Sequence, residues 1–497
     1  MTPKSPAQTR RLLYYAVASR LLLLTLITLS RSLLSPYDTS ASINPPCLST
    51  NSNHHAQPQV LLPRVATAIE SSIVWDGVYF IRIAECGYEY EQSYAFLPWL
   101  PLCIYLFANT VFAPLIPVIG YRAVLGLSGY VINNVAFVFS AMFLYRLSVA
   151  VLKDPEVALR ASILFCFNPA SIFYSSVYSE SLYAFLSFGG LYHFMNGADN
   201  YATIWLALSG SARSNGVLNA GYICFRTMLQ VHKAFLSRRH YYRALKILVC
   251  GALRGLCIFI PFISFQAYGY LNICMGNYVD EMRPWCKARL PLLYNYIQSH
   301  YWGVGFLRYF QVKQLPNFLL ASPILSLAIC SIVYYVKLWP EVFLSLGFKS
   351  SSLEKELVVS PLSIGAEGGP IIGNTENGAS NVLQDDRTIR LRKKTVKRED
   401  LVAQPSKSEP CGSLQCVPVV ILPYVLHLSF MVGTAVFVMH VQVATRFLSA
   451  SPLVYWFASH MMRSPGIGKR WGHFIWAYCA AYIFLGSLLF SNFYPFT

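Results

Sequence analysis

The stretch SSIVWDGVYFIRIAECGYEYEQ, residues 71–92, is a polar, acid-bearing segment between very apolar ones. If its first half is helical, five side chains recur at spacings of four and three residues and share one stripe of the helix. They are Ile69, Ile73, Asp76, Phe80 and Ile83. Such a helix would lie along a membrane surface and hold one carboxylate at the edge of the low-dielectric region, which suits a general base. The alternative is that Asp76 caps a helix beginning at Gly77 and that the glutamates behind it are solvated.

The composition is that of a polytopic membrane protein. Hydrophobic residues make up 55% of the 497 residues and charged residues only 12%, and the mean hydropathy is +0.44. Too few charges remain to cover several soluble domains. The formal charge of +17 would suggest nucleic acid in a soluble protein. Here basic cytosolic loops are a simpler source of that charge, so nucleic-acid binding is not expected.

The N-terminus predicts the orientation of the chain. Its basic flank is expected to stay in the cytosol, and residues 12–35 are expected to be a retained signal anchor that ends in the lumen. Arg31 can snorkel to the lumenal surface, whereas Arg20 lies deeper and needs a partner or a cavity. Residues 36–64 then form a lumenal loop, which places the 71–92 stretch on the lumenal side.

Two polar breaks interrupt the apolar segments that follow. Five such segments are expected, at 95–118, 121–150, 157–175, 178–195 and 201–228, before the chain returns to a basic cytosolic turn at 229–246. The breaks are FNPASIFYSSVYSES at 167–181 and SGSARSNG at 209–216. Polar backbone at membrane depth is tolerated where it faces protein or a wet cavity. The alternative is helix packing through small residues, with Arg213 snorkelling.

The rest of the chain completes a predicted total of about eleven spans. Spans are expected at 247–274 and 317–338, around a long aromatic lumenal loop at 275–316, and three more lie in the C-terminal part. The predicted organisation is a transmembrane catalytic module (1–340) with lumenal loops 36–94 and 275–316, a disordered cytosolic loop (341–416) and C-terminal transmembrane helices (417–497).

The thirteen cysteines show no zinc-binding spacing. Most lie in apolar runs, where cysteine behaves as a small hydrophobic residue. Cys47 and Cys86, or Cys274 and Cys286, can pair if their loops face an oxidising lumen.

Three lumenal segments are expected to converge: the 71–92 stretch, the 275–316 loop and HVQVATRF at 440–447. Carboxylates and cations that meet beside lipid suit the transfer of a sugar from a lipid phosphate, because a base must take the acceptor proton and cations must stabilise the leaving phosphate. The candidate cations are Arg82, Arg213, Arg308, His440 and Arg446. A transporter could assemble the same residues but would more often show internal repeats, and none is evident.

Six blocks of sequence, spread over nearly the whole chain outside residues 36–64 and 341–416, resemble the GPI mannosyltransferase 2 (phosphatidylinositol glycan class V) family. They are WDGVYFIRIAECGYEYEQSYAFLPWLP at 75–101, NPASIFYSSVYSES at 168–181, ARSNG at 212–216, RPWC at 283–286, YNYIQSHYWGVGFLRYFQVKQLPNFLLASP at 294–323 and HVQVATRF at 440–447. The resemblance implies an all-α polytopic membrane protein with the GT-C-type glycosyltransferase fold, about 11 transmembrane helices and amphipathic helices in the first lumenal loop.

The resemblance also implies an activity. The enzyme would lie in the endoplasmic reticulum membrane, with a lumenal active site. It would transfer the second mannose, α1,6-linked and with inversion, from dolichol-phosphate-mannose to the precursor of the glycosylphosphatidylinositol (GPI) anchor. No metal or other cofactor is expected. The partners would be the two lipid-linked substrates, and the sequence does not decide whether a small membrane accessory subunit also binds. The alternatives are a mannosyltransferase that uses the same donor with another acceptor, and a polytopic lipid or solute transporter.

The resemblance matches Asp76 to the acidic residue that this class of enzyme places in its first lumenal loop, and Asp76 is therefore the predicted general base. Predicted substrate-binding residues surround it. They are Trp75, Glu85, Glu91, Arg213, Trp285, Tyr301, Trp302, His440, Gln442 and Arg446. Glu180 is left open, because the span count puts it toward the cytosolic end whereas its place in a matching block suggests the lumenal site. Either the fourth and fifth spans are short or re-entrant, or Glu180 is structural.

Overall fold

The computed structural model describes residues 6–37, 47–48, 60–236, 241–275, 283–349, 418–464 and 466–496. Most of the predicted cytosolic loop 341–416 lies outside these residues, as does a separate unit spanning Ile364–Leu414. The described residues belong to the other unit and form helices joined by turns, with no strand among them. The all-helical membrane protein expected from the sequence is confirmed.

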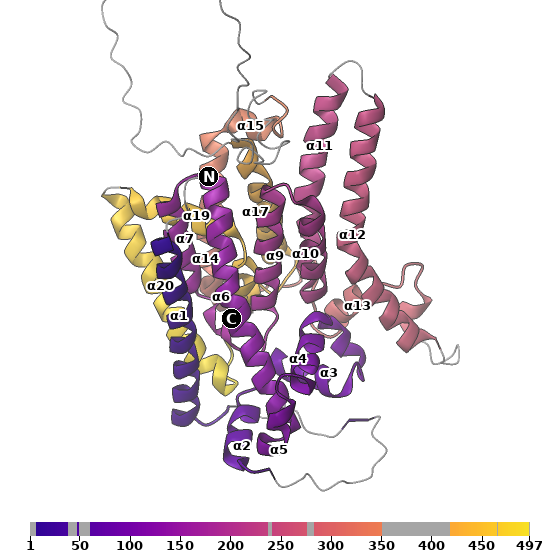
Figure 1. Ribbon diagram of the computed structural model, residues 1–497, viewed down its shortest axis with the longest axis vertical. Coiled ribbons are helices and arrows are strands. Elements are labelled where there is room, and N and C mark those ends of the chain that lie inside the picture. Colours follow the sequence, from indigo (N-terminus) through magenta and orange to yellow (C-terminus); the bar gives the residue numbers. More distant parts are fainter. Residues whose placement is uncertain are drawn as a thin grey trace, which may run out of the picture. The chain divides into compact units, whose positions relative to one another are not determined.

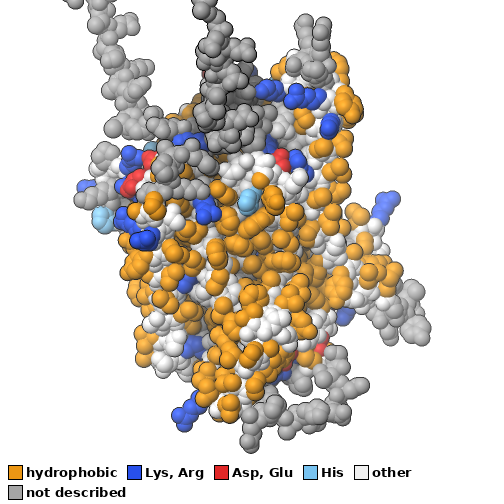
Figure 2. All heavy atoms as spheres, in the orientation of Figure 1, with side chains coloured by type: hydrophobic (Ala, Val, Ile, Leu, Met, Phe, Trp, Pro, Cys, Tyr) orange, Lys and Arg blue, Asp and Glu red, His pale blue; other side chains and the backbone are white. Residues whose placement is uncertain are grey.

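Six of the described helices are long and apolar enough to cross a membrane. They are α1 (Pro6–Leu33), α6 (Tyr121–Leu152), α12 (Tyr241–Cys274), α14 (Leu315–Leu338), α17 (Pro418–Phe437) and α20 (Ile467–Leu489). At about 1.5 Å per residue, a helix of some 20 residues matches a hydrocarbon core of about 30 Å. In Figure 2 hydrophobic side chains cover much of the visible face, and Lys and Arg side chains are more frequent in its upper part, which includes the end where α11 (Ala220–Leu236) and α12 meet.

Several predicted spans are too short to cross alone. Helix α7 (Pro155–Cys166) has 12 residues, α9 (Glu180–Met195) has 16 and α10 (Asp199–Ala212) has 14. At about 1.5 Å per residue each falls short of about 30 Å. The polar breaks between these helices make them short. Helix α9 packs against α6, and α10 packs against α9 (Figure 1). The count of eleven spans is not confirmed, because apolar half-helices have the same composition as full spans.

The segment 95–118 is also not a straight span. It contains α4 (Trp99–Asn109), which is followed by a second helical stretch, Ala113–Ile119, at a bend of 67°. If this bent pair counts as one span, the described residues hold up to seven. Figure 1 shows α4 and α5 (Ile116–Ile119) together with α2 and α3 around the lower end of α6.

The predicted stripe from Ile69 to Ile83 is divided between two helices. Helix α2 (Pro63–Ser71) ends before the stretch reaches Asp76, and α3 (Asp76–Cys86) begins there. Residue Trp75 between them has φ 52°, a left-handed conformation that breaks the helix. The single continuous helix was therefore wrong, although Ile73 and Phe80 are both buried as the stripe required.

Arg20 has the partner that its depth demanded. It donates from Nη2 to the carbonyl oxygen of Cys166 (3.0 Å) and from Nη1 to Ser171 O (3.2 Å) and Ser175 Oγ (2.9 Å). Its guanidinium carbon lies 3.6 Å from the centroid of the Phe137 ring. These contacts give a donor to the Cys166 carbonyl group at the end of α7 and bind the first residue of α8 (Ser171–Ser175), which stabilises the break between the two helices inside the bundle.

Both cysteine pairs that were left open form disulfides. Cys47 bonds to Cys86 at the end of α3, and Cys274 at the end of α12 bonds to Cys286. The second disulfide closes the loop that leads to α13 (Leu293–His300). The first disulfide therefore holds the end of α3, the helix that carries Asp76. The second holds the aromatic loop 283–302 against the end of α12.

Candidate active site

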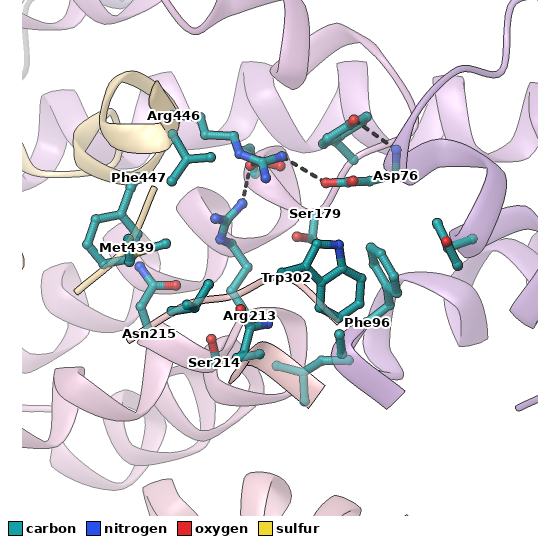
Figure 3. A pocket seen from close by; sticks show the side chains of 18 of the residues that line it. Asp76, Phe96, Ser179, Arg213, Ser214, Asn215, Trp302, Met439, Arg446 and Phe447 are labelled. Atoms are coloured by element: carbon teal, nitrogen blue, oxygen red, sulfur yellow. Dashed lines mark hydrogen bonds and ion pairs between the residues drawn. The ribbon is translucent and has the colours of Figure 1, made fainter. Parts of the chain in front are cut away.

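One cavity of about 410 Å³ collects most of the predicted site residues (Figure 3). Its walls come from the start of α3, residues 95–97, the turns at 178–180 and 212–215, the region of α13, and residues 439–447. Seven of the eleven predicted residues line it. They are Trp75, Asp76, Arg213, Trp302, His440, Gln442 and Arg446.

Four charged side chains form an alternating chain along one wall of the cavity. The Asp76 Oδ2 atom lies 2.8 Å from Nη1 of Arg446, and this nitrogen lies 4.0 Å from Oε1 of Glu180. Glu180 in turn pairs with Arg213. In Figure 3 the guanidinium groups of Arg213 and Arg446 point toward each other, with Asp76 on the far side of Arg446. Two positive and two negative charges therefore balance in a site whose charged side chains range from 2% exposed at Glu180 to 34% exposed at Asp76.

Asp76 is the first residue of α3 and does not cap it. The N-cap position is occupied by Trp75, and no side chain makes a capping hydrogen bond there. The backbone N–H of Asp76 donates to the Tyr178 hydroxyl at 2.9 Å, while the carboxylate projects into the cavity and is 34% exposed. The capping alternative is therefore wrong, and the carboxylate is free of any capping hydrogen bond and can face a ligand in the cavity.

Trp75 holds the start of α3 through its side chain. Its indole N–H donates to the carbonyl oxygen of Phe490 at 3.1 Å, and its ring lies 5.8 Å from that of Phe493. A non-glycine residue at φ 52° stores backbone strain, which persists only where the surroundings hold it. The C-terminal segment thus fixes the direction in which Asp76 points.

Glu180 is the first residue of α9 and only 2% of its surface is exposed. The turn before it packs tightly, because Val177 fits against the small residues Gly77 of α3 and Gly129 of α6. A Cβ added at Gly129 would approach a Val177 methyl group to 2.9 Å. Of the alternatives left open for Glu180, the short spans are correct: α7 ends early, so the chain turns back and brings Glu180 into the cavity with Asp76.

The two arginines come from short breaks in helical structure. Arg213 lies between α10 and the 3-10 helix Ser214–Asn219, where Gly216 approaches Ser209 so closely that an added Cβ would lie 2.3 Å from its carbonyl oxygen. Arg446 lies in the short helix α18 (Ala444–Leu448), over the rings of Phe173 and Tyr178. Arg213 therefore faces a cavity, as one alternative held, and does not snorkel to the surface.

Aromatic rings form the opposite side of the cavity. The rings of Tyr79 and Phe96 stack at 4.6 Å, and Trp302 meets Phe96 edge-on at 6.3 Å (Figure 3). Burial raises the pKa of the Tyr79 hydroxyl, and the Asp76 carboxylate raises it further, so this phenol stays neutral. Such rings offer apolar faces together with polar edges that can form hydrogen bonds.

Polar side chains close the remaining walls. The hydroxyl groups of Ser214 and Tyr294 lie 2.8 Å apart, and Tyr309 donates to Gln442 Oε1 at 3.0 Å. The His440 ring stacks on Tyr309 at 4.6 Å. Asn215 adds a buried amide whose nitrogen has no hydrogen-bond partner among the described residues. These groups can bind hydroxyl groups of a ligand without adding charge.

The structure places the other four predicted residues outside the cavity. Glu85 pairs with Arg122 at 2.8 Å. Glu91 accepts hydrogen bonds from Trp285 Nε1 at 2.6 Å and from the Tyr301 hydroxyl at 2.7 Å. Desolvation and this bond to Glu91 raise the pKa of Tyr301 to about 12. Glu91, Trp285 and Tyr301 form a clasp between the short 3-10 helix Glu91–Ala95 and residues 283–302.

Two of the candidate cations also lie elsewhere. Arg82 pairs with Glu89 at 2.7 Å, and Arg308 is exposed beside Gly305. Several residues that line the cavity were not among the predicted site residues. Among them are Tyr79, Phe96, Tyr178, Asn215 and Tyr294. Most lie in the sequence blocks quoted above, but nothing in their spacing marked them as facing one cavity.

Potential metal ligands cluster once in the described part of the chain, at Cys47, Cys86 and Glu89. The two cysteines are joined as a disulfide, so their sulfur atoms are not thiolate ligands. In the cavity, both carboxylates face arginine. That donor set is suited to binding an anion through the arginines, and the expectation of no metal cofactor stays a prediction.

Fold and site together define an integral membrane enzyme of the group-transfer kind, with a carboxylate and an arginine pair facing one cavity. Residues 9–497 match the family model described as Mannosyltransferase (PIG-V), and the chain belongs to this family of mannosyltransferases.

Curated relatives cover most of the chain. It is 28% identical to "GPI alpha-1,6-mannosyltransferase 2" of Cricetulus griseus over 480 residues, which is 92% of this chain and 85% of the relative. It is 28% identical to the protein of the same name from Homo sapiens over 485 residues (93% and 86%). It is also 28% identical to "GPI mannosyltransferase 2" of Drosophila melanogaster over 457 residues (85% and 86%). No solved structure matches the chain.

Proposed function

We propose that this chain transfers the second mannose, α1,6-linked, from dolichol-phosphate-mannose to the GPI-anchor precursor in the endoplasmic reticulum membrane. The names of its relatives supply the acceptor class and the linkage. The observation that carries the chemistry is the chain of charges in which Asp76 and Glu180 share Arg446 and Arg213. Transfer from a lipid phosphate needs this combination, a base for the acceptor and cations for the leaving group.

The reaction is one displacement at the anomeric carbon of mannose. The 6-hydroxyl oxygen of the acceptor attacks this carbon while its proton passes to Asp76. The bond from the anomeric carbon to the phosphate oxygen breaks, its electron pair stays with the phosphate, and the β-linked donor gives an α-linked product. The leaving dolichyl phosphate gains one negative charge, which Arg446 and Arg213 stabilise.

Arg446 couples the two ends of this reaction. In the structure its Nη1 atom bonds to the Asp76 carboxylate. When the proton reaches Asp76, this carboxylate loses its charge at the moment when the phosphate gains one. The guanidinium can therefore exchange its partner without any change in the net charge of the site.

The aromatic side of the cavity is the proposed sugar-binding side. Trp302 and Phe96 present ring faces, and Ser214, His440 and Gln442 present hydrogen-bonding groups. Mannose has apolar C–H faces and hydroxyl edges, which such a wall matches. Trp75 is proposed to act mainly by holding Asp76 in place.

We further propose that the protein has the GT-C-type fold and that its cavity faces the lumen. The disulfides Cys47–Cys86 and Cys274–Cys286 support this orientation, because structural disulfides persist in oxidising compartments. The basic end of α11 and α12 supports it as well, since positive loops stay in the cytosol.

The lipid intermediate that accumulates without the protein tests the function. Cells that lack it should accumulate the one-mannose GPI precursor and lose surface GPI-anchored proteins, and re-expression should reverse both effects. Membranes with the protein should convert this precursor to the two-mannose form when dolichol-phosphate-mannose is added. Normal anchors with altered N-glycans would instead indicate another acceptor, and no glycolipid change would refute a mannosyltransferase of this pathway.

A further inference from the structure

Glu180 is a buried carboxylate for which the transfer scheme has no use as an acid or base. It pairs with Arg213, lies 4.0 Å from Nη1 of Arg446, and is 2% exposed. Its Oε2 atom makes no hydrogen bond within the described residues. Burying an ionised carboxylate this deeply costs free energy, which its attraction to neighbouring arginines must offset.

The net charge of the site stays the same during the reaction, but one negative charge moves from Asp76 to the phosphate, while Glu180 stays charged throughout. Before transfer, Asp76 and Glu180 together balance Arg213 and Arg446. After transfer, Asp76 carries the acceptor proton and is neutral, while the product phosphate monoester lies against both arginines. Of the carboxylates described in the cavity, Glu180 alone then still opposes their charge.

Without that opposition, the two guanidinium groups would present two full positive charges to the product. Two guanidinium groups that are only 17% and 22% exposed bind phosphate strongly, and a tightly held product leaves slowly. A carboxylate between the arginines weakens this attraction by a fixed amount and keeps both groups directed toward the cavity.

We propose that Glu180 is a positioning residue that acts through Arg213 and Arg446 and limits how tightly the site holds the phosphate of the lipid product. The proposal rests on the proposed function, because it assumes that a lipid phosphate is the leaving group. It assigns Glu180 to product release, whereas proton removal belongs to Asp76.

The test compares product inhibition of the purified full-length protein and its variants, with a short-chain polyprenyl monophosphate as the probe. Glu180→Gln removes the charge but keeps the shape of the side chain. Its inhibition constant should fall on the order of tenfold, since one opposing charge is lost close to the phosphate. Turnover at saturating donor should fall with it, because release becomes slower.

Two further variants separate charge from structure. Glu180→Asp keeps the negative charge and should hold the inhibition constant near that of the wild type. Glu156→Gln, which removes an exposed carboxylate paired with Arg160 on α7, should also leave it unchanged. Each variant is checked for wild-type elution and melting behaviour before it is assayed.

The sign of the effect decides the outcome. If Glu180 served the fold alone, Glu180→Gln would loosen the arginines, and polyprenyl monophosphate would bind more weakly or equally well; either result overturns the proposal. If neither the wild type nor Glu180→Gln is inhibited by polyprenyl monophosphate, the donor in the proposed function is wrong and the role of Glu180 falls with it. A result that refutes only the role of Glu180 can thus be distinguished from one that also refutes the proposed function.

Discussion

Replacing Asp76 with asparagine should abolish transfer while leaving the fold nearly intact. The Asp76 side chain is 34% exposed and that of Arg446 is 22% exposed, so solvent screens their ion pair. Exposed pairs contribute about 0.2–1 kcal/mol to stability. Asparagine keeps the size of the side chain and an oxygen that can accept the Arg446 hydrogen bond. The melting temperature in detergent should therefore change by only a few degrees.

The effect on catalysis should be far larger. A positioned general base contributes about 10²- to 10⁴-fold to the rate, which corresponds to roughly 2.7–5.4 kcal/mol at the transition state. The turnover of Asp76→Asn should fall by this factor, measured as conversion of one-mannose to two-mannose GPI precursor by purified enzyme. In deficient cells the variant should fail to restore surface GPI-anchored proteins.

Glu85→Gln is the contrasting variant, because its carboxylate pairs with Arg122 outside the cavity. It should lower stability while turnover per folded molecule stays near the wild type. Full activity of Asp76→Asn would refute the assignment of the base. Equal losses in both variants would mean that the acids of this stretch act through the fold alone.

Three other predictions concern the supports of the cavity. Arg20→Met should lower the free energy of unfolding by about 2–4 kcal/mol, measured by denaturation in detergent, since the buried hydrogen bonds of the guanidinium to Cys166, Ser171 and Ser175 are lost; exposed Arg10→Met should not. Glu91→Gln should weaken the clasp to Trp285 and Tyr301 by about 1–2 kcal/mol and speed limited proteolysis within residues 283–302, and unchanged cleavage would contradict the clasp. Trp302→Ala should raise the KM for the acceptor about tenfold through the loss of a ring contact, and Phe306→Ala, on an exposed neighbouring side chain, is the control.

The sequence predicted those features of the fold that depend on cost in a membrane. Arg20 in a span demanded a partner, and Asn168 with Pro169 demanded a break, because both are expensive in lipid. The structure contains both the partners and the break, and they coincide, because Arg20 bonds to the residues on either side of the break after α7. The exact helix lengths could not be predicted, because a buried half-helix and a full span have equally apolar sequences.

The candidate site was predictable for the charged residues and not for their partners. Asp76, Arg213 and Arg446 stood out as charges in apolar surroundings, and they meet in the cavity. Glu85 stood out equally, but its ion pair with Arg122, 37 residues away, removes it from the site. Such pairing depends on which helix faces meet, and residue spacing along the chain does not contain that information.

The Arg20 contacts also impose an order on how the protein can be assembled. The chain supplies the partners of Arg20 146 to 155 residues after Arg20 itself. At about 5–20 residues per second, synthesis takes roughly 7–30 s to reach them. Throughout that interval α1 carries an arginine without its final partners, at a cost of about 2.5–3.5 kcal/mol near the bilayer centre. The contacts of Arg20 can therefore form only after α7 and α8 have been made.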